Sequence, residues 1–86
     1  VGRRGRGHRG VKDLVTYLVK SLVDDPGAVR VREAAGERGG VVEIQVSPAD
    51  RGRLIGKEGR TIRAIRALVT AAGSRDGRRV GVEILD

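Results

Sequence analysis

The stretch LIGKEGRTI at residues 54–62 decides the fold, because two apolar residues run there into a Gly-x-x-Gly turn and a helical pattern follows it. Glycine permits a sharp turn with positive φ, and it has no Cβ atom that would hold a ligand away. Lys57 lies at the tip of this turn. A helix that starts at Gly59 or Arg60 points its free N–H groups into the same space, so the sequence predicts a turn that receives a phosphate.

The Gly-x-x-Gly spacing alone has little value, because the chain has 14 glycines and contains the spacing four times. Residues 2–5 and 7–10 lie in a tail without hydrophobic residues beyond Val1. Residues 36–39 join two strand-like runs, where glycines are ordinary turn residues. Residues 56–59 join two helix patterns, and this context distinguishes them from the other three.

The composition limits the chain to one small domain. Its 86 residues bury only about 60% of the surface of the unfolded chain. Cysteine and methionine are both missing, which excludes a disulfide framework and a thiolate metal site. No apolar run approaches the roughly 20 residues needed to span a bilayer, and no signal segment opens the chain. We therefore expect a soluble, cytoplasmic protein without a membrane association, a metal or a cofactor.

Positive charge is concentrated in two places. The net charge is +7, and residues 1–12 contribute five bases without an acid. Residues 50–66 hold six bases against two acids, on the turn and its flanking helices. Both excesses suit a polyanion. Tyr17 is the only aromatic residue, so folds that stack several bases on aromatic rings are excluded.

The first part of the chain combines a tail with a helix. Residues 1–10 are rich in arginine and glycine, and we expect a disordered basic tail that either binds RNA non-specifically or is only solvated. The periodicity of the next residues predicts a helix that ends at Asp24-Asp25-Pro26-Gly27. The apolar face of this helix is formed by Val11, Leu14, Val15, Leu18, Val19 and Leu22.

Two strands should follow as a hairpin. Valine alternates with arginine over residues 29–32, and apolar residues alternate with polar ones over residues 42–46. A glycine-rich turn joins the two runs. Arg30 and Arg32 then face Glu43, which is most simply cross-strand charge pairing and not contact with RNA.

Ser47-Pro48-Ala49-Asp50 carries three signals of a helix start: an N-cap serine, a proline at the first helical position and an acid three residues after the cap. This short helix should run to about Ile55. The next helix should end at Gly73, and a final strand alternates apolar and polar residues over residues 79–84. The polar face of the longer helix consists of Arg63, Arg66 and Thr70, and its inward face of Ile62, Ile65, Leu68, Val69 and Ala72.

The order helix, strand, strand, helix, Gly-x-x-Gly, helix, strand resembles the type II KH domain of prokaryotes. The likeness covers residues 11–86, and IGKEGRTI at 55–62 is similar to the KH signature. Further similar segments are LVDDP at 22–26, VSPAD at 46–50 and VEILD at 82–86. The chain is similar in length to the stand-alone bacterial KH proteins of the KhpA family. The resemblance implies an α/β (α+β) two-layer sandwich of order α-β-β-α-α-β, with three helices on a mixed three-stranded sheet.

The resemblance also implies single-stranded RNA in a narrow groove beside the turn. The turn Gly56-Lys57-Glu58-Gly59 would clamp backbone phosphates, while the groove holds about four nucleotides. The other expected contacts are Ile55 and Ile62 as the groove floor and Arg53, Arg60 and Arg63 as its rim. Simpler alternatives remain, with both isoleucines as core residues, the arginines as a solvated face and Gly56 as a helix C-cap. Glu58 is unfavourable beside a phosphate unless it points to water or favours the helix N-terminus.

The leading hypothesis is a non-enzymatic RNA-binding protein, and the resemblance implies an RNA chaperone or post-transcriptional regulator linked to cell elongation and envelope homeostasis. It also implies a larger KhpB-type partner with KH and R3H domains; a homodimer stays open. The alternative function is an assembly protein with vestigial RNA binding, which a large exposed apolar patch would favour. DNA is not excluded, because a phosphate clamp does not distinguish it from RNA. Catalysis has little support, since the sequence has no cysteine, one tail histidine and no paired carboxylates in an apolar setting.

Overall fold

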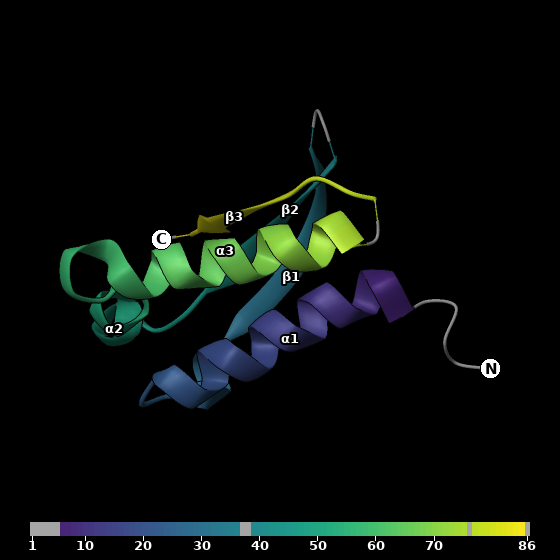
Figure 1. Cartoon of the computed structure of the whole chain (residues 1–86). Coiled ribbons are helices and arrows are strands. Elements are labelled where there is room, and N and C mark those ends of the chain that lie inside the picture. Colours follow the sequence, from purple (N-terminus) through teal and green to yellow (C-terminus); the bar gives the residue numbers. More distant parts are fainter. Residues whose placement is uncertain (1–5, 37–38, 76, 86) are drawn as a thin grey trace.

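The structure is a computed structural model that describes residues 6–36, 39–75 and 77–85. Its elements are α1 (Arg6–Leu22), β1 (Arg30–Gly36), β2 (Gly39–Gln45), α2 (Arg51–Ile55), α3 (Arg60–Arg75) and β3 (Val80–Ile84). Short 3-10 turns at Pro26–Ala28, Pro48–Asp50 and Lys57–Gly59 separate some of them. The helices form one layer against the sheet (Figure 1). The predicted α-β-β-α-α-β order and the two-layer α+β class are confirmed.

The sheet is mixed, with the strand order β1-β2-β3. β1 and β2 form the predicted antiparallel hairpin, in which Val31 lies opposite Ile44. β2 and β3 are parallel, in the register that sets Val42 beside Val82. A parallel pair requires a long crossover connection, which α2 and α3 provide here. α3 consequently lies between the edge strand β3 on one side and α1 on the other (Figure 1).

One of the two predicted cross-strand charge pairs forms. Arg32 Nε lies 3.0 Å from Glu43 Oε1, on the face of the sheet away from the helices. Arg30 instead lies opposite Gln45 and donates to the carbonyl oxygens of Gly27 and Val29. The arginines of β1 are therefore held by this hairpin and its entry turn.

The core lies between the helices and the sheet, and it is built mainly from valine and isoleucine. Leu14, Leu22 and Leu68 are 36%, 41% and 46% exposed, so the prediction that they point inward is wrong. α1 and α3 lie side by side on a sheet of three strands, so each helix buries only the sector that faces the sheet. The fully buried side chains of the core are Val11, Val15, Val19, Val42, Ile44, Leu54 and Val69.

The first helix is longer than predicted. The sequence indicated a disordered tail over residues 1–10, whereas α1 begins at Arg6. Residues 1–5 lie outside the described residues. Extending an existing helix costs much less than nucleating a new one, so a helix packed from Val11 onward continues back through residues 6–10.

Gly73 is a point of close approach and not the predicted end of α3, which continues to Arg75. A Cβ atom at this position would lie 2.7 Å from Val80 Cγ2 and 3.1 Å from the Arg78 carbonyl oxygen. The Arg78 N–H donates to the Gly73 carbonyl at 2.8 Å. The missing side chain therefore allows the end of α3 to pack directly on the start of β3.

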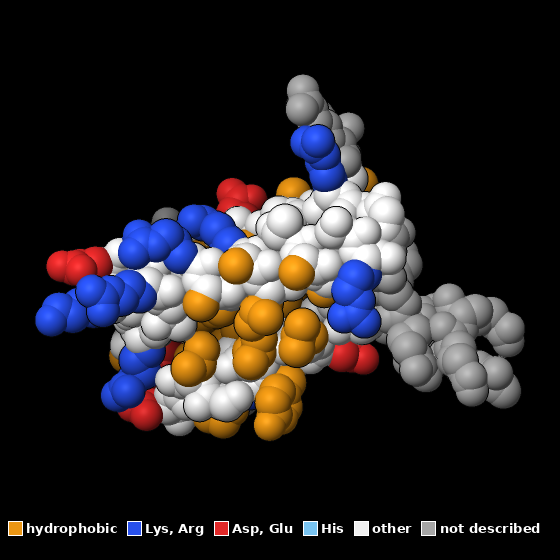
Figure 2. Space-filling view, viewed as in Figure 1, with side chains coloured by type: hydrophobic (Ala, Val, Ile, Leu, Met, Phe, Trp, Pro, Cys, Tyr) orange, Lys and Arg blue, Asp and Glu red, His pale blue; other side chains and the backbone are white. Residues whose placement is uncertain are grey.

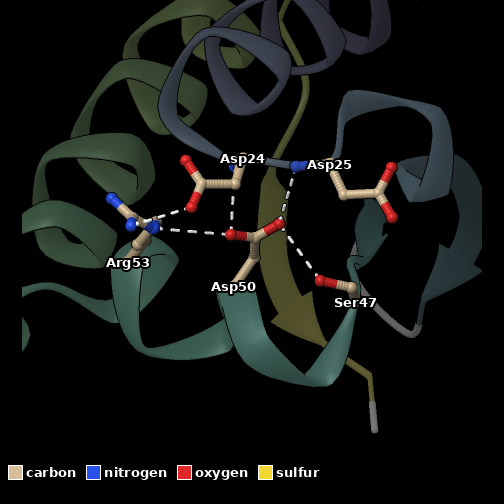
Figure 3. Close-up of polar contacts among 5 residues, drawn as sticks. All are labelled: Asp24, Asp25, Ser47, Asp50 and Arg53. Atoms are coloured by element: carbon tan, nitrogen blue, oxygen red, sulfur yellow. Dashed lines mark hydrogen bonds and ion pairs between the residues drawn. The ribbon is translucent and has the colours of Figure 1, made fainter.

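A buried carboxylate joins the end of α1 to the start of α2 (Figure 3). Asp50 is only 2% exposed, and it accepts hydrogen bonds at 3.0 Å from the backbone N–H groups of Asp24 and Asp25. Ser47 does not cap the helix with its side chain as predicted; its hydroxyl donates to Asp50 Oδ2 at 3.1 Å. Arg53 Nε lies 3.5 Å from Asp50 Oδ1.

This hydrogen bonding lowers the pKa of the Asp50 carboxyl from its ordinary value of 3.8. The Asp24 N–H is the largest cause, and the Asp25 N–H, the Ser47 hydroxyl and the Arg53 charge act in the same direction, while burial opposes them. A carboxyl with a lowered folded pKa stabilises the fold above its unfolded pKa, and this stabilisation is lost as the pH falls through the folded pKa. The domain should therefore lose stability below about pH 4.

Replacing Asp50 with asparagine tests this junction. In Asp50→Asn the charge-assisted bonds are lost, so we expect a lower melting temperature at neutral pH and a flatter dependence on pH between about 5 and 3. Thermal denaturation followed by circular dichroism measures both effects. Asp13→Asn, which changes an exposed carboxylate on α1, is the matched control. Equal melting of Asp50→Asn and this control at neutral pH would contradict the structural role of the buried carboxylate.

Candidate functional site

The turn between α2 and α3 doubles the chain back within four residues. Gly56, Glu58 and Gly59 have positive φ values of 79°, 58° and 74°. The Gly56 N–H donates to the Gly52 carbonyl at 2.8 Å, and the Gly59 N–H donates to the Gly56 carbonyl at 3.1 Å. α3 starts directly afterwards at Arg60, one of the two predicted starts. The turn therefore lies at the tip of a helical hairpin (Figure 1).

Gly56 is required by both conformation and space. Its φ of 79° and ψ of 169° lie in a region that is essentially restricted to glycine. A Cβ atom here would overlap the Thr61 hydroxyl group and lie 2.7 Å from Thr61 Cβ. Gly56 also follows the last residue of α2, so it is the C-cap that the sequence suggested. The same residue allows α2 and α3 to approach each other closely.

Glu58 has the left-handed backbone conformation that non-glycine residues adopt uncommonly. Its carboxylate lies 3.5 Å from Arg60 Nη2, and the two side chains are 68% and 73% exposed. So exposed an ion pair contributes little stability. Glu58 therefore points to water and to Arg60, which is one of the orientations that the sequence left open.

Three cations surround the turn. Lys57 and Arg60 are exposed on the turn and at the start of α3. A Cβ atom at Gly59 would lie 3.5 Å from Arg63 Nη1, which places that guanidinium group directly beside the turn. Lysine and arginine side chains gather at this end of the molecule (Figure 2). Their summed field attracts an anion to the exposed backbone of the turn.

Three other predicted site residues have different environments. Arg53 Nη2 lies 2.9 Å from Asp24 Oδ2, so this arginine is turned toward Asp24, just after α1, and toward the buried Asp50 (Figure 3). Ile62 is 6% exposed and belongs to the core, as one of the simpler alternatives stated. Ile55 is 40% exposed at the end of α2, so the core alternative does not apply to it.

The two flanks of α3 differ in chemistry. Thr61, Ala64 and Leu68 line a hollow together with residues of α1. At about 100° per residue, Arg63, Arg66 and Thr70 fall within about 60° of one another on the opposite flank. All three are exposed, and this flank borders β3. We call it, together with β3, the α3–β3 surface. Arg66 was not among the predicted site residues, although its spacing from Arg63 was a signal for it.

A second surface is apolar, and we call it the α1–α3 face. Orange side chains line a hollow between α1 and α3 in Figure 2. Tyr17 is 72% exposed on this side of α1. The hollow is lined by Leu18, Ser21, Leu22, Arg60, Thr61, Ala64, Ile65 and Leu68. We include Leu14 and Tyr17, which lie on the same flank of α1. This face carries the exposed leucines that the sequence assigned to the core.

Residues 6–36, 39–75 and 77–85 hold neither a membrane-spanning helix nor a cluster of metal ligands. No helix in these ranges is both long and apolar enough to cross a bilayer. Histidine, cysteine, aspartate and glutamate side chains form no group of three in these ranges that could hold a metal ion.

Comparisons with known proteins identify the family. A family model described as the KH domain of KhpA/KhpB matches residues 12–84. The chain is 47% identical to the RNA-binding protein KhpA of Aquifex aeolicus over 76 residues, which cover 88% of this chain and 96% of that protein. It is 50% identical to the protein of the same name from Leifsonia xyli over 72 residues, which cover 84% of this chain and 92% of that protein. It is also 47% identical to the RNA-binding protein KhpA of Clostridium perfringens over 75 residues, which cover 87% of this chain and 100% of that protein. These relatives are named as RNA-binding proteins and not as enzymes. The family model and the relatives together show that the chain belongs to the KhpA/KhpB family of KH domains.

Proposed function

We propose that the chain binds single-stranded RNA, without catalysis, by holding a backbone phosphate at the Gly56–Gly59 turn. The observation that carries the proposal is a projecting turn with positive φ at three positions and with Lys57, Arg60 and Arg63 around it. Such a turn lets a phosphate approach the backbone closely, while the cations supply the opposite charge. The relatives named RNA-binding protein KhpA support RNA as the polyanion.

The bases would lie along the α3–β3 surface. Ile55 is exposed beside the turn, and Val82 and Ile84 of the edge strand are only partly buried. The bases would rest on this aliphatic surface, which suits a chain whose single aromatic residue, Tyr17, lies on the α1–α3 face instead. Arg53 is already paired with Asp24 and Asp50, so its contribution to binding would be smaller than that of Arg63.

The cellular role that we propose is that of a cytoplasmic RNA chaperone or post-transcriptional regulator. Phosphate contacts of exposed lysine and arginine are sequence-independent and reversible, which suits a protein that acts on many RNAs. The family resemblance implies a link to cell elongation and envelope homeostasis, which we include in the proposal.

Single-stranded RNA should bind more tightly than duplex RNA of the same sequence. A single strand can lay its exposed bases along the α3–β3 surface beside the turn, whereas the bases of a duplex are paired with each other. Fluorescence anisotropy with a labelled unpaired oligonucleotide and with its duplex, at physiological salt, measures the difference. Equal or tighter binding of the duplex would argue against this site.

The variant Lys57→Asp/Glu58→Asp should lose RNA affinity without losing its fold. Aspartate tolerates the left-handed conformation at position 58, and both side chains are exposed. A phosphate would then meet two carboxylates in place of one cation and one carboxylate. Charge-assisted contacts contribute about 1.5–3 kcal/mol, so the affinity should fall at least about tenfold in an oligonucleotide titration.

Lys12→Asp is the matched control, because it changes the net charge by the same amount at an exposed position on α1. It should weaken binding much less than the turn variant. Thermal melts of both variants confirm that each one folds. If the turn variant melts like the parent and binds RNA equally well, the turn is not the site and an assembly function takes precedence.

A second function, protein assembly, is favoured by the α1–α3 face. Leu14, Tyr17, Leu22 and Leu68 are large apolar side chains that this face leaves exposed. Contiguous apolar patches of this kind mark interaction sites. The face carries both protruding leucines and a hollow lined by apolar residues, so under a twofold axis the leucines of one copy would enter the hollow of the other. We therefore propose a second copy of this chain as its occupant, with a KhpB-type KH protein as the alternative.

Leu68→Glu should dissociate the dimer, because the twofold axis would bring two carboxylates into one apolar interface. Gln45→Glu adds the same charge to the exposed face of the sheet and should have no effect. Sedimentation velocity over a wide concentration range measures the mass of each variant. A parent chain that stays monomeric would rule out self-association, and binding of a KhpB-type protein that Leu68→Glu abolishes would identify the alternative occupant.

A further inference from the structure

Glu58 is the acidic residue of the turn, and the fold does not require it there. Its φ of 58° and ψ of 27° lie in the left-handed region, where asparagine and aspartate are enriched among the non-glycine residues. Its carboxylate contacts only Arg60 among the described residues, and so exposed a pair contributes little stability. The fold would therefore accept an uncharged asparagine at this position at least equally well.

Arg60 is the cation of the turn that is already engaged. Within the described part of the chain, no ion pair involves Lys57 or Arg63. Arg60 Nη2 lies 3.5 Å from Glu58 Oε1, two residues earlier in the chain. Carboxylate and phosphate oxygens bind a guanidinium group through the same N–H donors. The Glu58 carboxylate is therefore placed where an RNA phosphate would meet Arg60.

The strength of this ion pair decides what it does to binding. The side chains of Glu58 and Arg60 are 68% and 73% exposed, so water competes with their attraction and a phosphate can displace the carboxylate. The displaced carboxylate stays on the turn, where its negative charge still acts against the phosphate. The pair therefore lowers the affinity of the turn without closing it.

We infer that Glu58 limits the affinity of the turn for RNA, because its carboxylate competes with a backbone phosphate for Arg60. Lys57 and Arg63 carry free charges for the strand, whereas Arg60 contributes only when its carboxylate partner is displaced. Differences of this kind act mostly on the dissociation rate, so Glu58 shortens the time for which the RNA stays bound. This inference rests on the proposed function, and it adds a residue of the same site that acts against binding.

Two substitutions of Glu58 separate its charge from its backbone conformation. Glu58→Gln removes the charge and keeps the length of the side chain. It should tighten binding of an unstructured eight-nucleotide oligouridylate about fourfold at physiological salt, and the slope of log affinity against log salt should steepen by about 0.7, the value of one further phosphate contact. Glu58→Asn should bind as tightly as Glu58→Gln but melt at a higher temperature, because asparagine suits the left-handed conformation. A gain in affinity confined to Glu58→Asn would assign the effect to the backbone and overturn the inference.

Arg60→Gln tests whether the effect passes through Arg60. If the carboxylate competes for this guanidinium group, the substitution Glu58→Gln should change the affinity much less in a chain that already carries Arg60→Gln. The four chains of this double-mutant cycle are titrated with the same oligouridylate. A gain as large as in the parent background would overturn the competition for Arg60.

Asp13→Asn is the matched control, because it removes the same charge from an exposed position on α1. It should leave the affinity unchanged. An equal gain from Asp13→Asn would reduce the effect to net charge and overturn the inference. If Glu58→Gln gains nothing while Lys57→Asp/Glu58→Asp still loses affinity, the inference falls and the turn remains the site. Absence of binding by the parent chain would instead contradict the proposed function itself.

Discussion

The parallel pairing of β2 with β3 is the constraint on which the rest of the structure depends. β3 begins beside the start of β2, since Gly40 is paired with Val80, so a chain that leaves β2 at Gln45 must travel back along the whole sheet. α3 makes this return. α2 has only five residues and ends before the return begins, so the reversal between the two helices lies beyond the end of the sheet. The exposure of the turn is thus a consequence of the sheet topology.

Because of the same constraint, α3 contacts three parts of the fold: the inner face of the sheet, α1 and the edge strand β3. Ile62, Ile65 and Val69 are buried against the sheet, which leaves two flanks for the surroundings. One flank meets α1 and is apolar, while the other borders the edge strand and is basic. At Gly73 the approach of β3 is so close that no side chain fits. One helix therefore separates two surfaces of opposite chemistry.

Local patterns in the sequence were sufficient for the element order, the turn and the start of α3. They were not sufficient for contacts between distant segments. Ser47 looked like a helix cap, but it donates to Asp50, whose other partners are the backbone N–H groups of Asp24 and Asp25 on a different part of the chain. Arg53 was assigned to the site by proximity in sequence, but the Asp24 carboxylate, 29 residues away in the chain, holds it together with Asp50. Leu68 has the spacing of the apolar face of α3, but it stays exposed because no further element covers that side of the helix in the described structure.

The separation of the two surfaces has a consequence for binding. The turn of one small domain makes few phosphate contacts, so its affinity for RNA is limited by their number. A dimer formed through the α1–α3 face would leave both α3–β3 surfaces free, because each copy uses opposite flanks of α3 for the two tasks. Two sites held on one particle make the second binding event intramolecular, which raises the avidity for a long RNA without any new contact. Arg60 borders both the turn and the hollow, so pairing would also bring the positive charge of each copy near the other and strengthen the field that attracts the polyanion.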